Sequence, residues 1–276
     1  MAKVALITGS TAGIGKETAL GLAKMGMDLI LPIRNAQKGD ALKKEILQQS
    51  PQAQIKFYDC NLASLKSIQA CAEQVKKDYP QIHILINNAG VWQQNQALSD
   101  DGIEMTFAVN HLAPFLLTNT LLDTLKNSAP ARIINVASDL HQGNINFSDI
   151  EFKKSYSGIG AYKQSKLANI LFTRFLAQKL EGTNVTANAL MPGFIATELF
   201  RNIPSFLRWI IPIFAKTPKQ GAQTSIYLAT SEEVKYTSGE YFKDKKRGKS
   251  SYNSKNTQTA ERLWEISEQY IQKILG

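Results

Sequence analysis

Short apolar runs alternate with longer amphipathic patterns along most of this 276-residue chain, and this alternation limits the fold more than any other feature. The runs are rich in Ile, Val and Leu and are apolar on both faces, as in strands that lie between two layers of helices. Strands joined by right-handed crossover helices pair in parallel. The sequence therefore predicts an α/β fold, with a single doubly wound parallel sheet flanked by helices on both faces.

The predicted elements follow one another without a dividing linker, so residues 1–276 are interpreted as one domain. Strands are predicted at residues 4–8, 28–33, 54–59, 82–88, 131–138 and 184–190. Helices are predicted near residues 13–25, 37–49, 65–79, 101–125 and 161–180, and another amphipathic helix carries Leu263, Ile266, Tyr270 and Ile274. The segment at about 194–217 is interpreted as a substrate lid, because its apolar side chains are too many for an idle exposed loop.

Charge and cysteine content narrow the function classes. The formal net charge of +9 favours anionic partners, but basic and aromatic residues are not arranged as in nucleic-acid-binding motifs. Cys60 and Cys71 form no CxxC pattern and lack a histidine cluster, so we expect no metal site and a reducing compartment. No signal or membrane-spanning segment is apparent. We expect a cytoplasmic protein. Residues 203–214 are apolar enough to lie on a membrane surface, so peripheral membrane contact is left open.

The first strand runs directly into TGSTAGIG, which opens the first helix. Gly9 permits a sharp turn, Gly13 lets the backbone approach a pyrophosphate, and Gly15 lets the helix pack closely on the strand. The diphosphate then meets free N–H groups and the positive end of the helix dipole. A glycine turn alone is weak evidence, but its position in a strand-turn-helix unit predicts a dinucleotide cofactor.

The end of the second strand bears on which dinucleotide is bound. An acidic residue there usually binds a free ribose 2′-hydroxyl, whereas this strand ends ILPIRN and places Arg34 at that position. A guanidinium can bind a 2′-phosphate in bidentate fashion, and Lys16 and Lys38 can add positive charge. The sequence therefore favours NADP(H) over NAD(H), with an NAD(H)-linked enzyme as the alternative.

Further motifs follow in a recognisable order: NNAG at 87–90, Asn110 in VNHLAPF, Ser138 at a strand end, and Tyr162 with Lys166 four residues later. Together with TGSTAGIG they resemble the short-chain dehydrogenase/reductase family, over residues 4–241. Finer stretches, among them PIRN, YKQSKLANILFTRFLA and ERLWEISE, resemble the retinol dehydrogenase-like reductases, including the WW-domain oxidoreductase group. Two features depart from the resemblance, namely Ala113 in place of a usual glycine and the lack of an N-terminal hydrophobic anchor.

The resemblance implies a Rossmann fold and an oxidoreductase that acts on CH–OH and C=O groups of lipophilic aldehydes, ketones or alcohols. Tyr162 would be the general acid in reduction and the general base in oxidation. Lys166 shares a helix face with Tyr162, so its ammonium group can favour the phenolate. Ser138 would orient the substrate oxygen, and Asn110 would hold a water for proton relay. The competing function is a cofactor-sensing protein without turnover.

The resemblance also implies the residues that contact the cofactor. These are Gly9, Ser10, Thr11, Gly13, Ile14, Gly15, Arg34, Asp59, Leu62, Asn88, Ala89, Gly90, Tyr162, Lys166, Pro192, Gly193, Ile195 and Thr197. Asp59 would bind the adenine amino group, and Asn87 would brace the sheet. His111 and His141 occupy no catalytic position of the family. A place in the lining of the substrate cleft is left open for His141. Homodimers and tetramers occur in the family, so both are left open.

Overall fold

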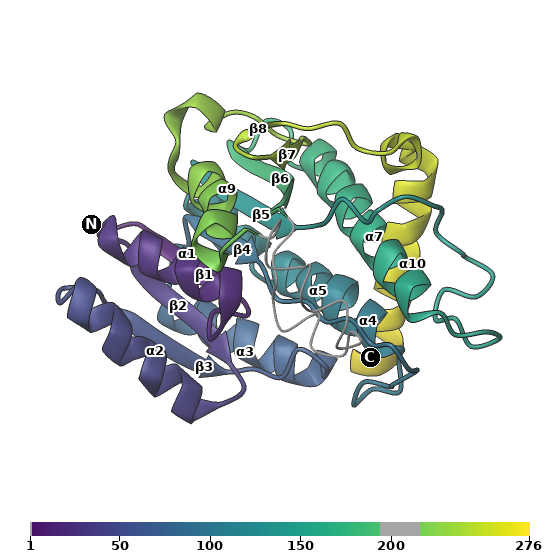
Figure 1. The fold of residues 1–276 in the computed structure, drawn as a ribbon, viewed down its shortest axis with the longest axis horizontal. Helices are drawn as coiled ribbons and strands as arrows, with labels where there is room; N and C mark the ends of the chain where they lie inside the picture. Colours follow the sequence, from purple (N-terminus) through teal and green to yellow (C-terminus); the bar gives the residue numbers. More distant parts are fainter. Residues whose placement is uncertain (1, 194–215) are drawn as a thin grey trace.

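A computed structural model describes residues 2–193 and 216–276 of the chain, and at its centre is an eight-stranded sheet (Figure 1). The strand order is β3-β2-β1-β4-β5-β6-β7-β8, and every neighbouring pair is parallel except β7 with β8. The strands are β1 (Val4–Ile7), β2 (Asp28–Ile33), β3 (Ile55–Asp59), β4 (Ile84–Asn87), β5 (Ala131–Val136), β6 (Val185–Met191), β7 (Tyr241–Lys243) and β8 (Lys246–Arg247).

Helices cover both faces of this sheet, which confirms the predicted doubly wound α/β fold (Figure 1). One face is covered by α1 (Gly13–Lys24), α2 (Ala36–Gln49) and α9 (Pro218–Thr230). The other is covered by α3 (Leu65–Asp78), α5 (Ala113–Thr120), α7 (Gly158–Lys179) and α10 (Thr257–Leu275). Shorter elements are α4 (Met105–Phe107), η1 (Ala108–Leu112), α6 (Leu122–Asn127), η3 (Glu232–Val234) and η4 (Tyr252–Lys255).

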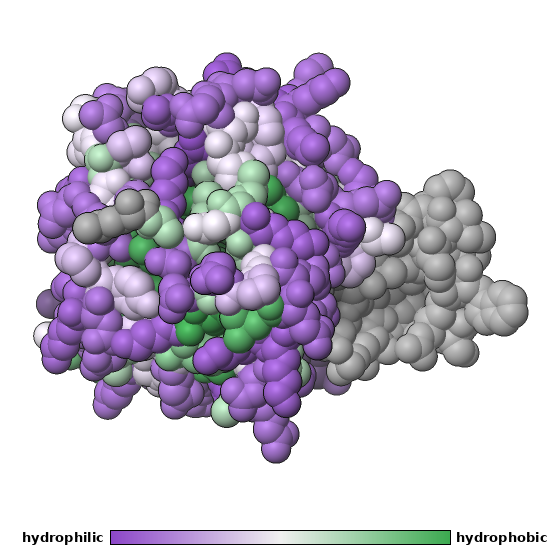
Figure 2. Space-filling view, turned by 90° about the vertical axis from the view of Figure 1, so that its left-hand side faces the viewer, coloured by the Kyte–Doolittle hydropathy of each residue, from purple (hydrophilic) through white to green (hydrophobic). Residues whose placement is uncertain are grey.

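The surface seen from the side that carries α2 is mostly hydrophilic, and hydrophobic residues appear there mainly in the gaps between polar ones (Figure 2). This distribution matches α2 itself, which buries only Gly39, Leu42 and Ile46, and exposes its charged residues except the half-buried Glu45. The apolar faces of α1 and α2 therefore point to the sheet, as the amphipathic patterns predict.

The strand order reverses beside β1, because β2 and β3 lie on one side of it and β4 to β6 on the other. Pairs such as Ile7 with Ile86 and Asn87 with Asn135 keep the strands in register, so their carboxyl ends meet at one edge of the sheet. Ligands of open α/β sheets bind at this kind of reversal point. The glycine turn after β1 lies directly at it.

The helix predicted over residues 101–125 is wrong as a single element. Leu98 instead forms a β-bridge with Glu104, and the Glu104 carboxylate accepts hydrogen bonds from the N–H groups of Thr106 and Phe107 at 2.9 and 2.7 Å. Helical structure therefore begins at Met105. It then passes through the π-helical segment η1 into α5, and α6 starts after Leu121.

The C-terminal helix α10 packs against α7, which carries Tyr162 and Lys166. Trp264 of α10 lies among aromatic rings, with centroid distances of 4.7 Å to Phe115, 5.8 Å to Phe172 and 5.3 Å to Phe175. Aromatic packing of this kind adds rigidity as well as buried area. The face of α7 that carries Phe172 is therefore held by a helix about a hundred residues later in the chain.

Two further expectations concern segments that the structure describes only in part. The segment expected as a substrate lid, 194–217, lies outside them except for Lys216 and Thr217, so the lid stays a prediction. Within residues 2–193 and 216–276, no helix is both long and apolar enough to span a bilayer.

Candidate active site

The glycine turn has the backbone that its sequence predicts. Gly9 and Gly13 have φ angles of +65° and +54°, a region that side chains disfavour. A Cβ at Gly15 would overlap the carbonyl oxygen of Gly9 and the amide nitrogen of Asn88, so only glycine allows this close approach. The N-cap of α1, Ala12, offers no side-chain cap, which leaves the first N–H groups of the helix free to bind an anion.

Hydrogen bonds join the glycine turn to the end of β4. The Asn88 amide donates to the carbonyl oxygens of Thr8 at 2.9 Å and Gly9 at 3.2 Å. The Thr8 hydroxyl in turn accepts from the N–H groups of Asn88 and Ala89 at 3.0 and 3.1 Å. The sequence did not single out Thr8, although a polar residue at the end of a buried strand is a signal for such a role. Asn87 braces the sheet as expected, through bonds to Thr118 and Asn135.

A groove of about 580 Å³ runs along this edge of the sheet. It is lined by many of the predicted cofactor contacts, namely Gly9, Thr11, Gly13, Ile14, Gly15, Arg34, Leu62, Asn88, Ala89 and Gly90. Arg34 and Lys38 supply positive charge, and none of the described residues that line the groove is acidic. Lys16 does not line it and instead pairs with Glu45 at 2.7 Å. Size, glycine turn and positive charge together fit a dinucleotide cofactor.

Other predicted cofactor contacts do not line the groove. Asp59 is exposed and lies outside the lining, whereas Asn61, two residues later, is part of it. The Ser10 side chain is fully buried, and its hydroxyl has no hydrogen-bond partner among the residues that the structure describes. Pro192 and Gly193 follow β6 but are not among the lining residues, while Ile195 and Thr197 lie outside the described residues.

The predicted catalytic side chains meet beyond the end of β5. The Ser138 side chain lies close enough to the Tyr162 hydroxyl to lower the pKa of that group. The Lys166 Nζ lies 5.5 Å from the centroid of the Tyr162 ring and donates to the Val136 carbonyl at 3.1 Å. A Cβ at Gly90 would lie 3.3 Å from the Lys166 Nζ, so this glycine gives the lysine room at the groove. The cluster and the groove are therefore contiguous.

Burial controls the protonation of this cluster. It raises the pKa of Tyr162 to about 12, although the hydrogen bond from Ser138 acts in the opposite direction. Burial also lowers the pKa of Lys166 to about 8. Near neutral pH the tyrosine therefore holds its proton and can donate it, and the lysine is charged but close to its titration point.

Asn110 lies in the π-helical segment η1, a type of distortion that is frequent at functional sites. Its side-chain oxygen accepts from the Val91 N–H at 2.7 Å, and its amide donates to the Val91 carbonyl at 2.9 Å and to Ser165 Oγ at 3.0 Å. The side chain thus joins the segment after NNAG to α7. The proton relay predicted for Asn110 stays a prediction.

Neither of the two histidines considered from the sequence points to acid–base chemistry. His111 is buried, lies 2.8 Å from Ser267 Oγ, and has a pKa lowered to about 3 by burial, so it stays neutral. His141 is also buried: its Nδ1 lies 2.6 Å from the Ser138 carbonyl and its Nε2 accepts from the Ser251 N–H at 2.9 Å. His141 therefore supports the backbone at Ser138.

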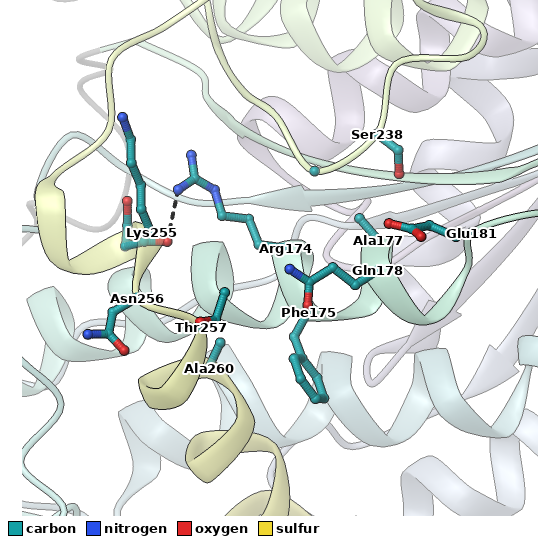
Figure 3. Close-up of a pocket in the computed structure, with 12 residues that line it drawn as sticks. Arg174, Phe175, Ala177, Gln178, Glu181, Ser238, Lys255, Asn256, Thr257 and Ala260 are labelled. Carbon is teal, nitrogen blue, oxygen red and sulfur yellow. Dashed lines mark hydrogen bonds between the residues drawn. The ribbon is translucent and has the colours of Figure 1, made fainter.

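A second cavity, of about 310 Å³, lies between α7, η4 and the start of α10 (Figure 3). Arg174 points into this region and donates to the Ser254 carbonyl at 3.0 Å and to Ser250 Oγ at 3.0 Å. Of the predicted catalytic and cofactor-binding residues that the structure describes, none lines this cavity. The candidate active site is therefore the groove with its adjoining cluster.

Comparisons with known proteins agree with this geometry. Residues 3–207 match the short chain dehydrogenase family. The chain is 45% identical to retinol dehydrogenase 12 of Homo sapiens over 268 residues, which cover 96% of this chain and 85% of that protein. It is 43% identical to retinol dehydrogenase 14 of Mus musculus over 283 residues, with the same shares covered.

A solved structure has the same fold. A crystal structure of an uncharacterized protein from Mycobacterium Paratuberculosis superposes with a TM-score of 0.81, at 30% sequence identity. The similarity covers 98% of this chain and 93% of the other.

Proposed function

This chain belongs to the short-chain dehydrogenase family, is retinol dehydrogenase-like and is an oxidoreductase of CH–OH and C=O groups, and we propose that it transfers hydride between NADP(H) and a lipophilic aldehyde, ketone or alcohol. The observation that carries the NADP(H) proposal is the charge of the groove, where Arg34 and Lys38 are present and no described lining residue is acidic. A nearby carboxylate would repel a 2′-phosphate, whereas a guanidinium binds it.

We expect Arg34→Ala to weaken NADPH binding by about 10- to 100-fold, the size of a lost charge-assisted hydrogen bond. NADH lacks the 2′-phosphate, so its affinity should change little. The measurement is the Kd of each cofactor by fluorescence titration. Lys16→Ala is the matched control, because Lys16 pairs with Glu45 outside the groove. Equal NADPH and NADH affinities in the unmodified protein would contradict the cofactor assignment.

The residues of the cluster have separate roles in the proposed reaction. The nicotinamide would supply the hydride in reduction and accept it in oxidation. Ser138 would hold the substrate oxygen beside the Tyr162 hydroxyl, whose pKa it already influences. Tyr162 would give its proton to that oxygen as the carbonyl is reduced. The Lys166 ammonium would stabilise the phenolate that remains and bind the nicotinamide ribose.

We expect kcat/KM for reduction to fall as pH rises through about 8, because Lys166 then loses the charge that stabilises the phenolate. In Lys166→Arg this pH-dependent loss should disappear, since a guanidinium stays protonated. The rate at neutral pH should also fall, since the longer side chain cannot keep the bond to Val136. Lys163→Arg, on the same helix, should retain the wild-type pH profile. A Lys166→Arg profile that still falls at pH 8 would contradict this role.

The lipophilic substrate is supported by the relatives, which are named retinol dehydrogenases, and by the apolar sequence of residues 203–214. A cytoplasmic location, with contact at a membrane surface left open, is part of the same proposal and is supported by the free thiols of Cys60 and Cys71. The direct test is NADPH oxidation with aldehydes and ketones of increasing chain length. Tight NADPH binding without oxidation by any of them would favour a cofactor sensor.

A further inference from the structure

Trp92 is the aromatic neighbour of the reactive tyrosine, and none of the roles above involves it. Its ring stacks on the ring of Tyr162, with centroids 5.4 Å apart and an angle of 28° between the planes. The residues on either side, Val91 and Gln93, line the cofactor groove, but Trp92 is not among the lining residues. The indole therefore contacts the catalytic tyrosine from outside the cofactor groove.

The backbone on both sides of Trp92 is anchored. Val91 is held by two hydrogen bonds to the Asn110 side chain, at 2.7 and 2.9 Å. The Gln93 carbonyl accepts from the Tyr156 hydroxyl at 2.9 Å. A Cβ at Gly158 would overlap that same carbonyl, so α7 begins in direct contact with this segment. Two separate parts of the chain, Asn110 in η1 and residues 156–158 at the start of α7, thus fix where the indole lies.

We infer that Trp92 is a positioning residue: its indole holds the Tyr162 ring in place and shields it from water, so that the proton leaves from a fixed point beside Ser138. The inference rests on the proposed function, because it assigns Trp92 a part in the same reaction. Offset stacked rings attract one another. A side chain that is already fixed in place loses less conformational freedom on reaching the transition state. Trp92 acts through Tyr162 and needs no contact with the reacting atoms.

The shielding has a measurable consequence. Tyr162 is only 8% exposed, and burial is the main cause of its raised pKa. Removing the indole would admit water to the ring, which favours the phenolate, so the Tyr162 pKa should fall. Among the described residues, the charged group that faces this ring is Lys166 on the same helix, and the polar group is Ser138 at the end of β5. Neither changes in a Trp92 variant.

The test compares Trp92→Ala with Trp92→Phe, which keeps an aromatic face. Tyrosine labelled with carbon-13 at the hydroxyl-bearing ring carbon lets the Tyr162 titration be followed by NMR with and without NADP⁺, and Tyr162→Phe identifies the signal. The same variants are measured for kcat with NADPH and the best carbonyl substrate, for NADPH Kd and for thermal unfolding. Trp92→Leu replaces the alanine variant if that variant does not fold.

For Trp92→Ala we expect a Tyr162 titration at lower pH and a kcat reduced about tenfold, with NADPH affinity unchanged. Trp92→Phe should stay within about twofold of the wild type in kcat, because the stacked pair is retained. An unchanged titration together with unchanged kcat in Trp92→Ala would overturn the inference, as would a loss of NADPH affinity alone. If the wild type reduces no carbonyl, the proposed function fails, but the NMR titration still decides the role of Trp92.

Discussion

Tyr162→Phe is expected to lower kcat for carbonyl reduction by about 10²- to 10⁴-fold, the usual contribution of a positioned general acid. The variant removes one hydroxyl group and keeps the aromatic ring, so the stacking on Trp92 remains available. What it removes is the hydroxyl group beside Ser138, which holds a proton at neutral pH. NADPH Kd and the thermal unfolding temperature should change little, since the glycine turn and Arg34 are untouched. Steady-state kinetics measures kcat, a cofactor titration on the same sample measures NADPH Kd, and a thermal melt measures the unfolding temperature.

A tyrosine elsewhere provides the control. Tyr227→Phe also removes one hydroxyl group, which donates to Glu233 at 2.8 Å on the surface, and it should keep wild-type kcat. Ser138→Ala should lower kcat as well, because the substrate oxygen loses its second hydrogen-bond partner. A Tyr162→Phe variant that keeps more than about a tenth of the wild-type kcat would remove Tyr162 from the proposed role of general acid.

Much of the fold was predictable because its signals are local. Strands such as β5 and β6 are buried along their whole length. A short segment that is apolar on both faces is typical of a strand buried between two helical layers. The proximity of the Tyr162 and Lys166 side chains was also predictable, since residues four apart on a helix share a face. The meeting of this pair with Ser138 followed from the parallel order of the strands, which brings their carboxyl ends to one edge.

Where the structure departs from the sequence pattern, the causes are long-range contacts or side-chain hydrogen bonds. The predicted helix over 101–125 missed the Glu104 carboxylate, which bonds to backbone N–H groups and starts the helix at Met105. Lys16 follows the glycine motif in sequence, yet it pairs with Glu45 on the next helix. At the end of β3, exposed Asp59 lies outside the groove lining and Asn61, two residues later, is part of it, so the adenine contact expected for Asp59 stays a prediction. Which residue after β3 lines the groove depends on the direction in which the chain turns there, and the strand pattern does not contain that information.

The second large effect is expected for Gly15→Ala, which should weaken NADPH binding by about 10² or more, because a displacement of about 1 Å in a binding site can have this effect. The added methyl group would overlap the Gly9 carbonyl oxygen and the Asn88 amide. Neither can move freely, since the Asn88 amide is itself bonded to the Thr8 and Gly9 carbonyls. The turn must therefore shift away from the diphosphate position. Fluorescence titration with NADPH measures the loss.

Gly21→Ala is the matched control, because it adds the same methyl group to the same helix. There the new Cβ would meet the end of the Ile226 side chain, which can rotate away, and alanine is the better helix former. Gly21→Ala should therefore bind NADPH like the wild type. Affinity within about threefold of wild type in Gly15→Ala would show that the turn tolerates a side chain, and the diphosphate would then have to bind elsewhere. A loss confined to Gly15→Ala would place the diphosphate at the start of α1, where uncapped N–H groups face the groove.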